Sequence, residues 1–164
     1  MPEIIVIAHN IRSTHNVGAI FRTADGFGIS KIILSGYTPY PRLSHGDTRL
    51  PHIADKLEKQ IHKTALGAER TVPFEYQEEP DLEALRSDGF RIVGLEQSSR
   101  STFLNKYKAP EKIALLLGEE VEGITTDLLE QCEDVLEIPM NGAKESFNVS
   151  VAAGVAMYAL TTNR

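Results

Sequence analysis

Short, continuously apolar segments alternate with helix-forming segments along the whole chain. This alternation restricts the possible folds more than any other feature of the sequence. The apolar runs are rich in Ile, Val and Leu, which is typical of parallel strands covered on both faces. Strands separated by helices predict an α/β fold with an open, mostly parallel sheet and helices on both faces. Strands are predicted at residues 3–8, 31–35, 71–76, 90–95, 112–117 and 134–138. Helices are predicted at residues 16–27, 54–65, 81–87, 125–132 and 148–161.

Length and composition exclude several classes of protein. The 164 residues are enough for one domain, so we expect a single domain over residues 1–164. No stretch approaches the roughly 20 apolar residues that cross a bilayer, and the first residues carry no basic leader. We therefore expect a cytoplasmic protein without a membrane segment. The single cysteine, Cys132, excludes an intrachain disulfide and a cluster of thiolate ligands, and we predict no metal site.

The charge of the chain is unevenly distributed. The formal net charge is −6, yet residues 1–50 carry five Lys or Arg against three Asp or Glu. Phosphate binding needs a locally positive surface rather than a positive protein, so the sequence permits an RNA partner. An asymmetry of this size can equally arise by chance.

The last predicted helix is unusual because residues 148–160 contain no charged side chain. A helix that is apolar all round must be buried on all sides, and one sheet at the chain terminus covers only one face of it. We predict that the remaining face packs against a second subunit, which makes the protein a homodimer through its C-terminal helix. The alternative is a central helix in a large monomeric core.

Polar residues and glycines follow three of the predicted strands, where open α/β sheets bind ligands. In residues 10–28, Asn16 lies in the first helical turn and Arg22 follows about 240° around the axis. An exposed ion pair with Asp25 is an alternative role for Arg22.

The second segment, residues 115–124, has three carboxylates between Gly118 and Gly123. It lacks the Lys-Ser/Thr of a phosphate-binding loop, and a solvated acidic turn before a helix is the alternative. In the third segment, residues 138–150, Ser146 and Asn148 are suited to cap the following helix.

Together the three segments carry a specific pattern. Asn-x5-Arg-Thr-Ala is followed by Gly-x-Glu-x-x-Gly and then by Ile-Pro-Met-x-Gly-x3-Ser-x-Asn-Val-Ser. This order resembles the three motifs of the SpoU/TrmH family, RNA ribose 2′-O-methyltransferases of the SPOUT superfamily that use S-adenosylmethionine. The resemblance covers about residues 10–157, nearly the whole chain.

The resemblance implies a fold and a cofactor site. The family's sheet domain ends in a deep trefoil knot, here at about residues 112–158, and the family is dimeric. The loops of the knot bind S-adenosylmethionine. The implied cofactor-binding residues are Leu95, Glu96, Gly118, Ile138, Met140, Ser146 and Phe147. Phe147 replaces the leucine that is usual in the third motif, so the shape of the pocket differs there.

The resemblance also implies a reaction, methyl transfer to a ribose 2′-OH of tRNA or rRNA. The implied catalytic residues are Arg22, Asn16, Glu120, Ser146 and Asn148. A guanidinium stays protonated at neutral pH and can stabilise the developing alkoxide of the ribose. For RNA binding we expect Arg12, His15, Arg42, Arg49 and Lys144, with residues 36–51 as a contact loop. A non-catalytic module that binds RNA or the cofactor on the same fold is the alternative function.

Overall fold

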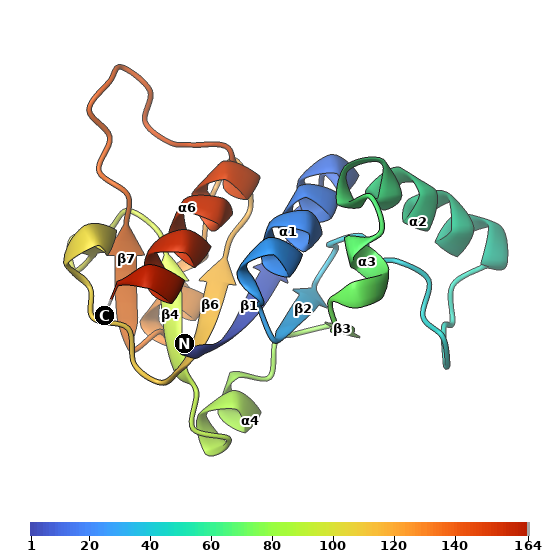
Figure 1. Ribbon diagram of the computed structural model, residues 1–164, viewed down its shortest axis with the longest axis horizontal. Coiled ribbons are helices and arrows are strands. Elements are labelled where there is room, and N and C mark those ends of the chain that lie inside the picture. Colours follow the sequence, from blue (N-terminus) through green and yellow to red (C-terminus); the bar gives the residue numbers. More distant parts are fainter. Residues whose placement is uncertain (164) are drawn as a thin grey trace.

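The computed structural model describes residues 1–163, which form seven parallel strands in the spatial order β3-β2-β1-β6-β4-β7-β5 (Figure 1). The strands are β1 (Glu3–His9), β2 (Lys31–Ser35), β3 (Phe74–Gln77), β4 (Arg91–Leu95), β5 (Thr102–Phe103), β6 (Lys112–Leu117) and β7 (Asp134–Glu137). The helices are α1 (Thr14–Phe27), α2 (Pro51–Ala65), α3 (Ala68–Thr71), α4 (Leu82–Ser87), α5 (Thr126–Glu130) and α6 (Val149–Thr162), with a 3-10 turn η1 at Leu104–Lys106. The predicted α/β class and parallel sheet are confirmed.

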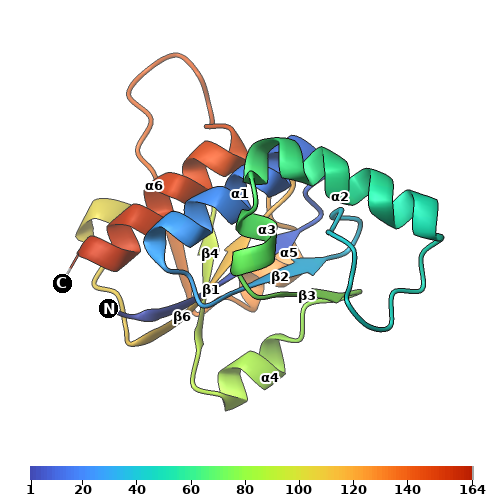
Figure 2. The ribbon, with the colours of Figure 1, turned by 45° about the vertical axis from the view of Figure 1, so that its right-hand side comes forward.

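Helices cover both faces of the sheet, as predicted (Figures 1 and 2). On one face, α1, α2, α3 and α6 pack with β1, β2 and β6 in a core that includes the fully buried Phe21, Ile61 and Met157. On the other face, the shorter helices α4 and α5 contribute Leu85 and Leu129 to a second, smaller core. Apolar strands buried on both sides therefore hold the sheet, which agrees with their unbroken hydrophobic sequences.

Helices α1 and α6 lie side by side and run in the same direction (Figures 1 and 2). Gly154 of α6 faces Thr23 of α1, where a Cβ would just reach ordinary contact with the Thr23 methyl group at 3.4 Å. At the far end, the rings of Phe27 and Tyr158 are 6.0 Å apart. Because the helices are parallel, their N-terminal ends meet at the carboxyl edge of the sheet.

The last strand along the chain, β7, lies between two strands that precede it in the sequence. Strand β7 comes last, yet it pairs with β4 on one side and β5 on the other, both formed earlier in the chain. This insertion is compatible with the knot implied at residues 112–158, which itself stays a prediction from the family resemblance.

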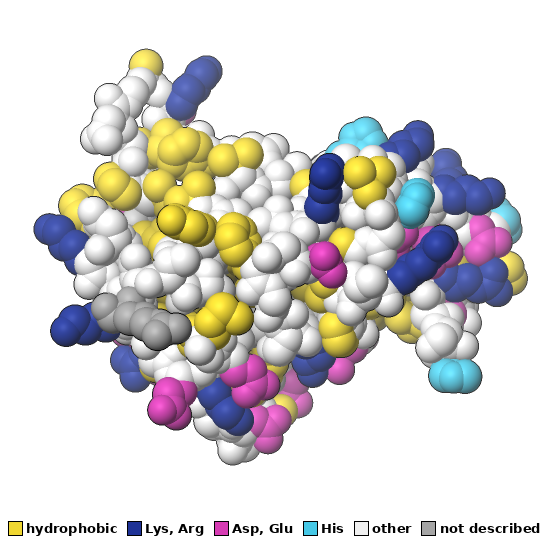
Figure 3. Space-filling model, in the orientation of Figure 1, with side chains coloured by type: hydrophobic (Ala, Val, Ile, Leu, Met, Phe, Trp, Pro, Cys, Tyr) yellow, Lys and Arg dark blue, Asp and Glu magenta, His cyan; other side chains and the backbone are white. Residues whose placement is uncertain are grey.

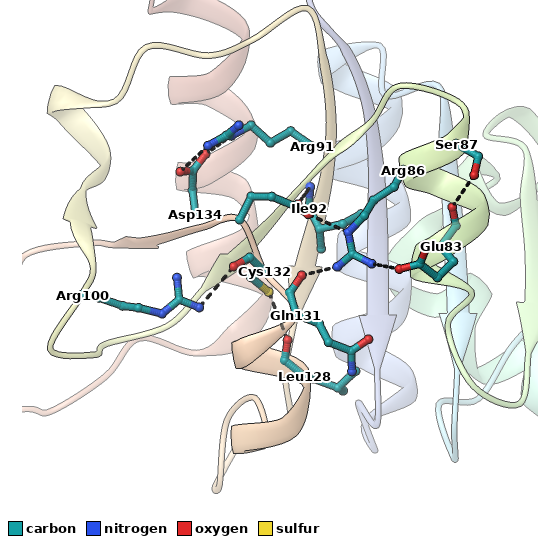
Figure 4. Close-up of polar contacts among 11 residues, drawn as sticks. Glu83, Arg86, Ser87, Arg91, Ile92, Arg100, Leu128, Gln131, Cys132 and Asp134 are labelled. Atoms are coloured by element: carbon teal, nitrogen blue, oxygen red, sulfur yellow. Dashed lines mark hydrogen bonds and ion pairs between the residues drawn. The ribbon is translucent and has the colours of Figure 1, made fainter.

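Three arginines tie this part of the sheet to the neighbouring elements (Figure 4). Arg86 of α4 donates to Glu133 at 2.6 Å, and Arg91 of β4 pairs with Asp134 of β7. Arg100 donates to the carbonyl of Cys132. Arg86 and Arg100 bind the segment just before β7, and Arg91 joins β4 to β7 within the sheet.

Three predicted elements needed correction. The helix predicted at 54–65 begins three residues earlier, at Pro51, since proline is well suited to the first helical position. A strand over 71–76 was wrong at its start, because Thr71 ends helix α3 and Pro73 has no N–H to donate, so β3 begins at Phe74. The helix predicted at 125–132 is shorter, Thr126–Glu130. Among residues 1–163, no helix combines the length and apolar character that crossing a bilayer requires.

Candidate functional site

A cavity of about 280 Å³ opens at the carboxyl ends of β4, β6 and β7, which is close to the lower end of common small-molecule pockets. The loops after these three strands form its walls, so segments far apart in sequence meet there. It includes all seven residues that the family resemblance assigns to the cofactor: Leu95, Glu96, Gly118, Ile138, Met140, Ser146 and Phe147.

Glycines allow the loop after β6 to fold tightly against this cavity. A Cβ on Gly118 would lie 2.4 Å from the backbone carbon of Gly123 and 2.4 Å from the nitrogen of Ile124. The loop is closed by two hydrogen bonds, from Glu119 N to the Gly123 carbonyl (3.1 Å) and from Gly123 N to the Glu119 carbonyl (2.9 Å). Gly123 itself has φ of +71°, which favours glycine.

Glu96 joins two of the cavity loops. Its carboxylate accepts from the backbone N–H of Ile124 at 3.0 Å and of Gln97 at 2.8 Å. The Gln97 amide in turn donates to the Glu145 carbonyl at 2.7 Å in the third loop. Glu96 therefore lines the cavity, but its oxygens already hold the loops in place.

Glu120 connects the second motif to the first. Its carboxylate accepts from the backbone N–H groups of Arg12 and Ser13 and from the Asn16 side-chain amide, each at 3.3 Å. Partial burial opposes ionisation, yet the backbone N–H of Glu120 itself and these three donors outweigh it and hold the pKa of Glu120 below its ordinary value. A carboxylate thus faces the start of α1 at neutral pH.

Asn148 completes a three-residue chain. Its side-chain amide donates to the Asn16 oxygen at 3.2 Å, while its own oxygen accepts from Ser150 N at 2.9 Å and caps α6. The predicted capping role of Asn148 is therefore confirmed, and the same side chain links the third motif to the first. Ser146 does not cap the helix and lies in the cavity wall.

Arg22 does not line the cavity of its own chain. It is exposed on α1, six residues or about 9 Å along the axis from Asn16. The alternative ion pair with Asp25 was wrong: Asp25 accepts instead from the Thr71 hydroxyl at 2.6 Å, and no ion pair of Arg22 forms within residues 1–163. The guanidinium is therefore available to a group that approaches from outside this chain.

The five residues expected to bind RNA fall into different environments. Arg12 and His15 are exposed at the start of α1, and Lys144 is exposed in the third cavity loop. Arg42 pairs with Asp55 at 2.7 Å. Arg49 binds within its own loop, to the Asp47 carboxylate and to the carbonyls of Tyr40 and Pro41, which directs its guanidinium inward.

Sequence reasoning missed two features beside this site. Tyr37 is 48% exposed and lies in the contact loop predicted at residues 36–51, but it was not singled out there; its signal was its position two residues after β2. Helix α2 carries a row of exposed basic side chains, and their helical spacing was the signal. Both features add aromatic or positively charged surface close to the start of α1.

Comparison with known proteins places these features in a family. Residues 3–158 match the SpoU rRNA Methylase family. A 23S rRNA (guanosine-2′-O-)-methyltransferase RlmB from Nitrosomonas europaea is 31% identical over 96% of this chain, which spans about half (55%) of that relative.

Two solved structures share the fold. The TrmH/SpoU tRNA modifying enzyme of A. aeolicus has a TM-score of 0.77 and 25% identity, covering 98% of this chain and 75% of that one. An AdoMet-bound rRNA methyltransferase from Sinorhizobium meliloti has a TM-score of 0.77 and 22% identity, covering 96% of this chain and 55% of that one. The match over nearly the whole chain, together with the three motifs that meet at one cavity, shows that the chain belongs to the SpoU rRNA Methylase family.

Proposed function

We propose that this domain transfers a methyl group from S-adenosylmethionine to a ribose 2′-OH of tRNA or rRNA in the cytoplasm. The observation that carries the proposal is the hydrogen-bonded chain Glu120–Asn16–Asn148, which joins all three motifs beside one cavity. The relatives' names include both rRNA and tRNA enzymes, so both RNA classes stay within the proposal.

The cavity suits S-adenosylmethionine in its chemistry. Ile138, Met140 and Phe147 give apolar walls for an adenine ring, and the tight backbone at Gly118 brings N–H and carbonyl groups close to the ligand. Six glutamates line the cavity, among them Glu119, Glu120 and Glu122, and they favour a cationic ligand over a phosphate. When bound, this cofactor supplies an electrophilic methyl group on a sulfonium.

Arg22 is proposed to act on the ribose. A ribose hydroxyl has a pKa far above neutral, so its attack requires stabilisation of the oxyanion that develops. A permanently protonated guanidinium supplies that charge and several directed N–H donors. Asn16, Glu120 and Ser146 would orient the groups around it, and Asn148 would hold Asn16.

A second copy of the chain is proposed to deliver Arg22. Phe147, Val151, Val155 and Tyr158 form an exposed apolar row that begins at the cavity and continues along α6, and Figure 3 shows apolar side chains gathered on that part of the surface. A twofold pair that buries this row would bring the outer face of α1 of one copy toward the cavity of the other. The separation of Arg22 from its own cavity supports this arrangement.

The test combines transfer with binding. The protein is incubated with radiolabelled S-adenosylmethionine and total RNA from a strain that lacks the gene, and label in RNA is counted. We expect Arg22→Ala to lose transfer by roughly a hundredfold or more, as expected when a charge-stabilising donor is removed, while calorimetric cofactor affinity stays within about twofold. Lys108→Ala, a change at another cation on the surface, is the control and should retain transfer.

The alternative of a non-catalytic binding module is distinguished by the same assay. A module would bind the cofactor and RNA, transfer no label in the wild type and respond to Arg22→Ala only in RNA affinity. Wild-type protein that is folded and binds cofactor but labels no RNA would contradict the enzymatic proposal.

A further inference from the structure

A second groove, of about 670 Å³, opens on the other side of the start of α1. Its walls come from residues 12–14, from residues 36–40 after β2, and from Leu57 and Gln60 of α2. The backbone N–H groups of Arg12 and Ser13 bind Glu120, so the groove borders directly on the candidate active site.

The chain holds the start of the 36–40 segment rigidly. Asn10 and Gly36 both have positive φ, and a Cβ on Gly36 would lie 1.9 Å from the Asn10 side-chain oxygen. That oxygen accepts from Tyr37 N at 3.1 Å. The buried Thr38 hydroxyl accepts from Ile11 N and donates to the Ala8 carbonyl, both at 2.9 Å. The backbone of Tyr37 is therefore fixed on both sides.

Tyr37 is nevertheless 48% exposed, and its hydroxyl finds no hydrogen-bond partner within residues 1–163. Tyr40, three residues later, is different: its ring stacks on Tyr76 at 4.2 Å, and Arg49 covers it at 3.6 Å. Tyr40 therefore builds the groove wall, whereas the Tyr37 ring stays half exposed.

The Arg12 guanidinium lies over the Tyr37 ring. Arg12 is exposed, its guanidinium carbon is 5.4 Å from the centre of the Tyr37 ring, and it has no carboxylate partner in the described chain. An exposed aromatic ring on a fixed backbone, next to a cation without a carboxylate partner, is the arrangement with which proteins bind an unstacked base and its phosphate.

Helix α2 adds a row of positive charge at the rim of the groove. Lys56, Lys59 and Lys63 follow a helical spacing and form no ion pair within residues 1–163. Figure 3 shows Lys, Arg and His side chains gathered over this helix. Successive members rise by about 5 Å, and like charges at this spacing disfavour a helix. A polyanion would relieve that repulsion, while the chain as a whole is acidic at −6.

We propose that this groove binds an unpaired RNA nucleotide next to the methylated one, with its base stacked on Tyr37 and neighbouring phosphates bound by Arg12 and the α2 lysines. The inference rests on the proposed function and names the part of the substrate that this surface recognises. An acidic protein partner would use the lysines but would have no need of an aromatic face, so the two occupants differ in their dependence on Tyr37.

Binding of a fluorescent single-stranded oligouridine, followed by anisotropy without cofactor, tests the proposal. Tyr37→Ala should weaken binding between about fivefold and a hundredfold, and Tyr37→Phe, which keeps the stacking face, should stay within about twofold of wild type. Phe103→Ala is a matched control, since Phe103 is 41% exposed with Lys106 at 5.5 Å from its ring, but it lies on the edge strand β5. It should change binding less than about twofold.

The proposed phosphate contacts are tested separately, by the dependence of RNA affinity on salt concentration. Replacing Lys56, Lys59 and Lys63 together by Gln should reduce the slope of log affinity against log salt by about 2, at about 0.7 per phosphate contact on a single strand. Lys106→Gln with Lys108→Gln should leave the slope unchanged.

The outcomes separate the two proposals. Oligouridine binding that depends on Tyr37 supports the groove even if no methyl transfer is found, in which case only the proposed reaction fails. Equal losses in Tyr37→Ala and Phe103→Ala, a Tyr37→Phe variant as weak as Tyr37→Ala, an unchanged salt slope, or no RNA binding by the wild type would each overturn the inference.

Discussion

Replacing Gly118 by Ala should disrupt the cavity through a single methyl group. The added Cβ would lie 2.4 Å from two backbone atoms of Gly123 and Ile124 and 2.6 Å from the Gly123 carbonyl oxygen. Ordinary contacts of this kind are about 3.4 Å or longer, so the Gly123–Ile124 backbone must move by about 1 Å. No flexible side chain can absorb this shift, because all three atoms belong to the main chain.

The expected loss of cofactor affinity follows from the hydrogen bonds that this movement breaks. The shift separates Gly123 from Glu119, which exchange hydrogen bonds of 3.1 and 2.9 Å, and Ile124 from the Glu96 carboxylate at 3.0 Å. Overpacking of a tight site costs about 1–3 kcal/mol, and each lost hydrogen bond about 1 kcal/mol. We expect Gly118→Ala to weaken calorimetric binding of S-adenosylmethionine by at least about tenfold, which corresponds to about 1.4 kcal/mol.

Gly142→Ala is the matched control, because Gly142 lies in the third cavity loop, has no positive φ and would have nothing within 4 Å of an added Cβ. It should bind the cofactor like the wild type. Circular dichroism would establish that both variants are folded. If folded Gly118→Ala binds the cofactor as tightly as Gly142→Ala, then the backbone around Gly118 does not form the cofactor wall.

Three further changes test other parts of the account. Val151→Glu introduces a charge at a 50% exposed position of α6 and should convert a dimer to monomers in analytical ultracentrifugation, whereas an unchanged sedimentation coefficient would count against the α6 interface. Burial raises the pKa of the Cys132 thiol to about 11, so at pH 8 iodoacetamide should modify the native protein roughly a hundredfold more slowly than free cysteine, and equally fast modification would refute that environment. The pKa of Glu120 is lowered in the folded state, so its ionised form contributes stability that is present above its ordinary pKa of 4.5 and is lost as the pH falls through the folded value. In urea unfolding, wild type should exceed Glu120→Gln by about 1 kcal/mol at pH 7, and this difference should shrink below pH 4.5 rather than grow.

The local hydrophobic pattern was sufficient to predict most strands of the sheet. Strands β2 and β6 begin and end as predicted because their residues are apolar without interruption and are buried on both faces. Strand β5 was missed because it has two residues, Thr102–Phe103, too few for any periodicity, and pairs only with β7. Helix α3 was missed for a similar reason, since its four residues lie between two stronger signals.

The environment of individual charges depended on tertiary structure. Arg42 and Arg49 look alike in sequence as loop cations, yet Asp55 and Asp47 reach them only once the loop has folded. In contrast, the Arg12 guanidinium has no carboxylate partner in the described chain, and the nearby Glu120 accepts only from its backbone N–H. The position of the three loops after strands already indicated that they meet at one edge of the sheet, but spacing left each loop with an ordinary alternative, and only the family resemblance gave their residues roles.

Methylation of a ribose hydroxyl by this domain is the central claim. The most direct measurement is nucleoside mass spectrometry on RNA from the strain lacking the gene, after incubation with the protein and methyl-labelled S-adenosylmethionine, with the RNA digested both by nuclease and by alkali. A methyl group on the 2′-oxygen blocks alkaline cleavage at that nucleotide, so we expect the label in an alkali-resistant dinucleotide and in a single 2′-O-methylnucleoside. A labelled methyl group on a base, or no label in any RNA, would contradict ribose methylation by this domain.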